Sequence, residues 1–124
     1  MTQEDKDLLL KDICGRLDCG VKIKIYNHYN DEYFNEFVTI ENISKIIDTF
    51  DISDIKPYLY PISSMSKKHK KYTRSNFTMG ATHELFDFLD RNNYDYRGLI
   101  EKGLAIDATN KTIEIVIIHF PLKT

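Results

Sequence analysis

The sequence of 124 residues has two cysteines and no apolar run of the roughly 18 to 20 residues that a membrane-spanning helix needs. Four residues separate Cys14 from Cys19, and two thiols alone make neither a zinc site nor a disulfide framework in a reducing cytoplasm. Residues 1–11 are charged and show no signal-peptide pattern. We therefore expect a soluble, cytoplasmic protein with a single domain over residues 1–124, in which Cys14 is buried on the apolar face of a helix.

Motifs that carry common chemistry are also missing. The sequence has no glycine-rich phosphate loop, no nucleophile elbow and no HExxH segment. Asp48, Asp51 and Asp54 recur every third residue, whereas a calcium loop needs ligands at alternate positions. His83 and Asp87 share one helical face, and we interpret them as a surface pair. We predict no metal, no cofactor and no catalytic residue, and these absences favour a binding protein over an enzyme.

Acidic residues are absent between Asp54 and Glu84, and that stretch contains the basic segment, residues 67–74. The segment carries +5 without its histidine, so the remainder of this chain, which has a net charge of −2, carries −7. Such a contrast predicts a surface for an acidic partner. The alternative interpretation is a solvated, lysine-rich face beside a loop.

The basic segment is expected to form a helix, with Ser63, Ser64 or Ser66 as its N-cap. Cations in the first turn of a helix are unfavourable by about 0.3 to 1 kcal/mol each. We therefore predict that the helix is weak or is stabilised by an anion such as a phosphate. Tyr72 and Phe77 add aromatic surface that can stack on a nucleic-acid base. The candidate partner- or anion-binding residues are Lys67, Lys68, His69, Lys70, Lys71, Tyr72 and Arg74.

Arg97 is the remaining candidate, because it stands beside two tyrosines in the polar segment of residues 94–98. A guanidinium in such a place can clamp a carboxylate or a phosphate. It can equally be a structural side chain that pairs with Asp95 or with a backbone carbonyl. Both interpretations stay open at this point.

Hydrophobic spacing predicts an α+β fold. We expect a mostly antiparallel sheet of about four to five strands, packed with an N-terminal helix and a second helix. The helices are predicted over residues 3–17 and 82–92, and the strands over residues 21–26, 33–40, 43–50, 104–108 and 112–120.

Two of these segments are ambiguous. Residues 43–50 have helical spacing, but the run is short and rich in β-branched side chains, so we interpret it as a strand. Pro57 and Pro61 restrict the residues before them to extended geometry, and we expect a polyproline-like connection over residues 56–61. Asp51 or Ser53 should cap a single helical turn before Pro57.

Residues 56–66 have the sequence KPYLYPISSMS, and residues 94–106 have the sequence YDYRGLIEKGLAI. Both segments, with the N-terminal helix and the Gly20-Val21-Lys22 that follows it, resemble a family of small uncharacterised proteins of gut bacteria and their phages or mobile elements. The resemblance covers most of residues 1–108 and implies no functional residue, because that family has no assigned activity. Its members carry glutamates where this chain has residues 67–70, so the basic segment is particular to this chain.

Three hypotheses follow. The first is a non-enzymatic accessory protein of a phage or mobile element, which binds a host or phage macromolecule in the host cytoplasm. The expected partner is a protein, and binding would modulate a defence or regulatory complex. The second is nucleic-acid binding through residues 67–74. The third is a small enzyme or ligand-binding domain with a phosphate or carboxylate site near Arg97. We expect no membrane association, and a monomer and a homodimer are both compatible with the isoleucine-rich strand predicted over residues 112–120.

Overall fold

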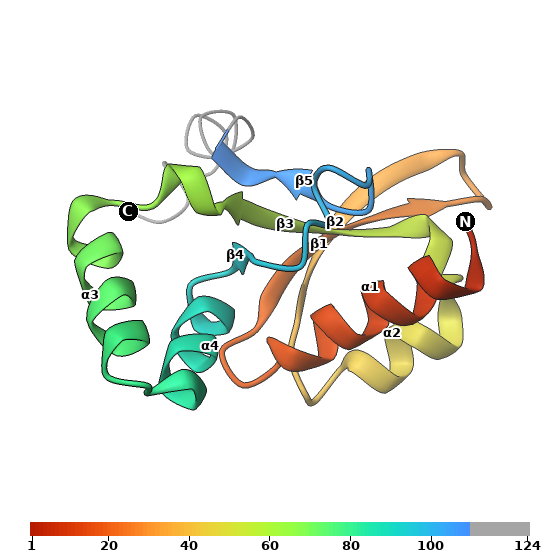
Figure 1. Cartoon of the computed structure of the whole chain (residues 1–124). Coiled ribbons are helices and arrows are strands. Elements are labelled where there is room, and N and C mark those ends of the chain that lie inside the picture. Colours follow the sequence, from red (N-terminus) through yellow and green to blue (C-terminus); the bar gives the residue numbers. More distant parts are fainter. Residues whose placement is uncertain (110–124) are drawn as a thin grey trace, which may run out of the picture.

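Three long strands form the centre of the fold in the computed structural model, which describes residues 1–109 (Figure 1). Strands β1 (Val21–Asn27) and β2 (Glu32–Val38) form an antiparallel hairpin. Strand β3 (Ile55–Pro61) lies antiparallel to the other edge of β1, with Ile23 opposite Pro57. The predicted hairpin is confirmed.

Two short strands complete the sheet from the C-terminal part of the described chain. Strands β4 (Tyr94–Asp95) and β5 (Ile106–Asp107) both run parallel to β3. The α+β class is therefore confirmed, but the sheet is mixed and not wholly antiparallel. The strand expected over residues 104–108 is the shorter β5, and the strand predicted over residues 112–120 lies outside the described residues.

Helices α1 (Gln3–Gly15) and α2 (Ile43–Thr49) pack together against one face of the sheet (Figure 1). The oxygen of Thr2 accepts a hydrogen bond from the amide of Asp5 and so caps α1. The buried side chains of this main core are Leu9, Ile13, Leu17, Val21, Ile23, Ile25, Val38, Ile46, Ile55, Leu59, Leu99, Leu104 and Ala105.

A second, smaller cluster lies at the end of the molecule formed by helices α3 (Lys67–Thr78) and α4 (Thr82–Arg91) (Figure 1). Its buried side chains are Met65, Leu85, Leu89 and Tyr94. Two 3₁₀ turns flank β3, at Ile52–Asp54 and Ile62–Ser64. Asp51 caps the first of these turns, as the sequence predicts.

The strand predicted over residues 43–50 is wrong, because these residues form α2. Ile46 is buried in the main core, and Ile43 and Phe50 pack against the same core. Helical spacing thus gives the segment one continuous buried side. This burial outweighs the preference of its β-branched isoleucines for a strand.

The polyproline-like connection predicted over residues 56–61 is also wrong, because the segment is β3. The extended geometry that prolines impose is compatible with a strand, and Pro57 occupies a ladder position opposite Ile23. Ile55 and Leu59 are fully buried on the side of the main core.

One smaller prediction also fails. Cys14 is exposed, because α1 buries Leu9, Asp12 and Ile13 and turns Cys14 away from them. The helix predicted over residues 82–92 is confirmed as α4, whose N-cap, Ala81, makes no side-chain capping bond.

Candidate anion-binding surface

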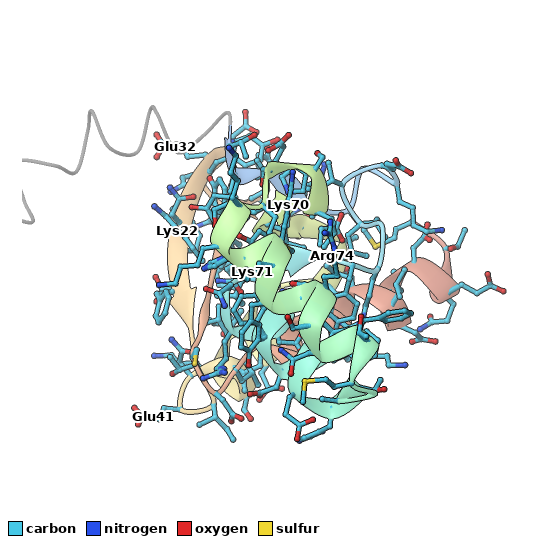
Figure 2. The ribbon with its side chains drawn as sticks, turned by 60° about the vertical axis from the view of Figure 1, so that its left-hand side comes forward. Lys22, Glu32, Glu41, Lys70, Lys71 and Arg74 are labelled. Atoms are coloured by element: carbon cyan, nitrogen blue, oxygen red, sulfur yellow. The ribbon has the colours of Figure 1, made fainter. Side chains whose placement is uncertain are left out.

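Helix α3 arranges most of the basic segment as a line of cations along its solvent-facing side. Ser66 caps the helix by accepting a hydrogen bond from the amide of His69 at 3.1 Å. The cationic stripe, defined as Lys67, Lys70, Lys71 and Arg74, follows the i, i+3, i+4, i+7 spacing that places side chains on one face. Figure 2 looks onto this helix and shows three of the four side chains on it.

The cations of α3 have no acidic counterpart nearby. Among residues 1–109 no carboxylate forms an ion pair with Lys68 or with any member of the cationic stripe. The labelled carboxylates of Glu32 and Glu41 lie at the rim of the view in Figure 2, away from α3. Like charges on adjacent turns repel one another, so an anion placed along the stripe would relieve an unfavourable interaction within the helix.

The inner side of α3 is held by aromatic contacts instead of a buried apolar stripe, because none of its residues is fully buried. A hydrogen bond of 2.7 Å joins Nδ1 of His69 to the Tyr94 hydroxyl. The His69 ring also meets the Phe88 ring edge-on at 4.9 Å, and the Tyr72 ring lies 4.4 Å from Phe88. His69 and Tyr72 therefore attach the helix to the body of the molecule.

A groove of about 510 Å³ opens between α3 and α4. It is lined by Lys68, His69, Lys71, Tyr72, Ser75 and Phe88. A smaller hollow of about 290 Å³ on the other side of His69 reaches Tyr60 and Tyr94. Cationic side chains thus stand beside aromatic walls, and this combination suits a ligand that carries both negative charge and flat rings.

The structure separates the two aromatic side chains that the sequence groups together. Tyr72 lines the groove on the inner side of α3, whereas Phe77 is 76% exposed. Phe77 follows Arg74 by three residues and Lys70 by seven, so it continues the cationic stripe at the C-terminal end of the helix. The stripe therefore ends in an exposed aromatic ring.

Arg97 lies away from α3, in a second group of charges that we call the arginine cluster: Asp12, Arg16, Asp90 and Arg97. Nη1 of Arg97 donates a 2.7 Å hydrogen bond to Oδ1 of Asp12, and it lies 3.8 Å from Oδ1 of Asp90. The pairing with Asp95 that the sequence suggests is not the one observed, because the Asp95 carboxylate accepts the amides of Leu99 and Ile100. These contacts support the structural interpretation of Arg97.

Arg16 is a charged residue of this cluster that sequence reasoning overlooks, as it overlooks Asp12 and Asp90. Its guanidinium is fully buried and makes a two-pronged pair with Asp12, at 2.8 and 2.9 Å. It also donates to the carbonyl oxygens of Leu89 and Tyr94, so it joins α1 to the end of α4 and to β4. The available signal was its position four residues after Asp12, on the side of α1 that carries Leu9 and Ile13.

Burial shifts the pKa of the groups at the edge of the cluster. Partial burial raises the pKa of the Asp90 carboxyl, although a hydrogen bond from Tyr96 and the nearby arginines oppose that shift. The pKa of Tyr96 rises to about 12, because burial and the bond to Asp90 both disfavour the phenolate. The Tyr96 ring also packs against Arg97, whose Cζ lies 4.5 Å from the ring centre. The two carboxylates and the two guanidiniums of the arginine cluster therefore compensate each other's charge.

The remaining candidate pairs form no further site among the described residues. His83 and Asp87 are both exposed on the surface, and the ion pair that Asp87 forms is with Arg91, at 3.2 Å. No group of three metal-binding side chains comes together within residues 1–109. No helix in the same part of the chain has the length and apolar character needed to cross a bilayer.

Comparisons with protein-family models, with curated proteins and with solved structures found no match to this chain.

Proposed function

We propose that this chain is a non-enzymatic binding protein, in which α3 docks on an acidic macromolecule. As an accessory protein of a phage or mobile element, it would work in the host cytoplasm. The single observation that carries the docking is the concentration of charge on α3, because the cationic stripe lies in a stretch, residues 55–83, that contains no Asp or Glu. The arginines of the arginine cluster, by contrast, are paired with carboxylates inside the fold. The origin in a phage or mobile element rests on the resemblance of residues 56–66 and 94–106.

Nucleic acid is the acidic macromolecule that the chemistry of α3 favours. Uncompensated cations attract the phosphate backbone irrespective of sequence. The exposed ring of Phe77 and the ring of Tyr72 flank those cations and offer stacking surface to bases. An acidic protein surface would use the cations but has less need of the rings.

The salt dependence of binding tests this proposal. We expect a fluorescent 20-nucleotide DNA strand to bind with an affinity that falls steeply between 50 and 200 mM NaCl. Replacing all four members of the cationic stripe by glutamine should reduce the slope of log K against log salt by about 3, because each phosphate contact on a single strand contributes about 0.7. Fluorescence anisotropy measures both quantities.

A matched control removes four other positive charges. Glutamine at Lys6, Lys11, Lys45 and Lys102 changes the net charge equally but lies outside α3. An equal loss of affinity in both variants would reject α3 as the binding element. If no nucleic acid binds, a protein partner becomes the remaining hypothesis, and a pull-down from host lysate with intact and charge-reversed α3 would test it.

A further inference from the structure

The sheet has a second face, opposite α1 and α2, that also combines lysines with aromatic rings. Along β1 the alternation of side chains places Val21, Ile23 and Ile25 in the main core, so the intervening residues point the other way. Direct cross-strand partners share a face, which extends this assignment to β2 and β3. The open sheet face is defined by Lys22, Lys24, Tyr26, Tyr33, Phe37 and Lys56.

Two rings of the open sheet face are accessible to a ligand. Tyr33 is 64% exposed and Phe37 is 56% exposed. The Phe37 ring nevertheless packs closely against Gly20, where an added Cβ would stand 2.3 Å from the ring. Gly20 has a φ of +86°, a conformation that favours glycine, so no side chain at this position displaces the ring. Phe37 is therefore exposed and pre-positioned.

The lysines of this face stand close to its rings. Nζ of Lys24 lies 4.6 Å from the centre of the Tyr33 ring, and that ring lies 5.0 Å from the Tyr26 ring. Lys22 extends toward the ring of Tyr58, with Nζ 5.7 Å from its centre. Cation and ring are thus presented side by side, as stacking and phosphate contact to one nucleotide chain require.

The open sheet face is positively charged. Its members include three lysines and no carboxylate, because Glu32 and Glu36 occupy the alternate positions of β2. A hollow of about 330 Å³ lies between Lys24, Tyr33 and Lys56. The carboxylate at its rim, Asp54, accepts a 2.8 Å contact from His28.

We propose that the open sheet face is a base-stacking platform for single-stranded nucleic acid, an inference that rests on the proposed nucleic-acid binding and names its substrate class. Exposed rings can stack only on bases that are not already enclosed in a duplex. In Figure 2 α3 faces the viewer and Lys22 of β1 extends to the left of it, so the two surfaces look in different directions. A strand bound on the open sheet face places its phosphates on the lysines and its bases on Tyr33 and Phe37.

The test compares three probes of equal length: a 15-nucleotide thymidine strand, the corresponding duplex, and an abasic strand that keeps the phosphates without the bases. The intact chain should bind the thymidine strand at least tenfold more tightly than the abasic strand. The double variant Tyr33→Ala/Phe37→Ala should lose on the order of tenfold or more in affinity for the thymidine strand and bind the abasic strand unchanged. Tyr33→Phe should retain binding, because it keeps the ring.

Tyr29 supplies the matched control, because this tyrosine is fully exposed at the tip of the hairpin and off the strands. Tyr29→Ala should leave all affinities within twofold, and circular dichroism should show every variant folded. Equal affinity for the thymidine and abasic strands in the intact chain, or an equal loss in the Tyr29 variant, would overturn the platform.

The two proposals fail separately. Loss of binding on neutralising the cationic stripe, with no effect of Tyr33→Ala/Phe37→Ala, would overturn the platform and leave the proposed function standing. The reverse pattern would keep the platform and reject α3. Failure of the intact chain to bind any probe would overturn both.

Discussion

The arginine cluster and the cationic stripe of α3 put positive side chains to opposite uses. In the cluster, the Arg16 side chain is fully buried and lies 2.8 Å from a carboxylate oxygen that Arg97 also reaches. In the stripe, Lys67, Lys71 and their neighbours point to solvent with no carboxylate of residues 1–109 within ion-pair distance. The first arrangement holds elements of the fold together, and the second leaves its charge available.

The difference separates the charges that stabilise the fold from the charges that the proposed function would use. Breaking a buried pair leaves an uncompensated charge and destabilises the fold strongly. Removing a solvated charge from a helix costs the fold little and can stabilise it. Substitutions in the two regions should therefore have opposite effects on stability and on binding.

The largest expected effect is that of Arg16→Met on stability. The change deprives Asp12 of its two-pronged partner and the carbonyls of Leu89 and Tyr94 of a donor. We expect the free energy of unfolding to fall by about 3 to 5 kcal/mol, measured by urea denaturation. The paired change Asp12→Leu/Arg16→Met should recover part of the loss, because no buried carboxylate is then left without its arginine. A loss below about 1 kcal/mol in the single variant would show that the cluster does not support the fold.

An intermediate effect of opposite sign is expected at the start of α3. Lys67→Glu and Lys68→Glu place acids in the first turn, where the helix dipole favours them. Each should raise the free energy of unfolding by about 0.3 to 1 kcal/mol while weakening nucleic-acid binding. Thermal denaturation and anisotropy on the same samples measure the two effects. Lys67→Gln, which removes the charge without adding an acid, should show a smaller gain, and a fall in stability would contradict the comparison.

The last effect is confined to alkaline pH and is a pH dependence at the edge of the arginine cluster. An unfolded tyrosine has a pKa of about 10, whereas burial raises the pKa of Tyr96 to about 12 in the folded chain. The folded state therefore keeps a proton that the unfolded chain loses, and this contribution is present below pH 10 and lost as the pH rises through 12. Tyr96→Phe should flatten the fall in stability over that interval.

Absorbance at 295 nm checks the same assignment directly, because it follows phenolate formation. The phenol that titrates at about pH 12 should be missing from the Tyr96→Phe variant. The matched control is Tyr29→Phe, which removes a fully exposed tyrosine and should leave the late phase intact. A late phase that persists in Tyr96→Phe would assign it to another tyrosine.

Local patterns predicted much of the fold. Capping and spacing located α1, the β1–β2 hairpin, the turn capped by Asp51 and the helix that begins after Ser66. Residues 43–50 were ambiguous, because helical spacing and β-branched composition disagree there and only packing against the main core decides. The parallel pairing of β3 with β4 and β5 joins segments far apart in the sequence, and no local signal specifies it.

The candidate surface was predicted in part for the same reason. Consecutive lysines in the sequence identify the cationic stripe, since a helix needs only local contacts to align them. The open sheet face has no local sequence signal, because its rings come from two strands and its lysines from β1 and β3. The sequence does not decide between a ligand-binding and a structural role for Arg97, because its partner, Asp12, lies at the other end of the described chain.

The small cluster beneath α3 and α4 has a consequence for motion. α3 buries none of its own residues and is attached through His69, Tyr72 and the neighbouring Met65, whereas the main core is made by other elements. We therefore expect α3 to detach at a lower free energy than that of global unfolding, with the sheet still intact. A partner bound to the cationic stripe would then hold α3 in place, so that recognition and ordering of the helix become one event.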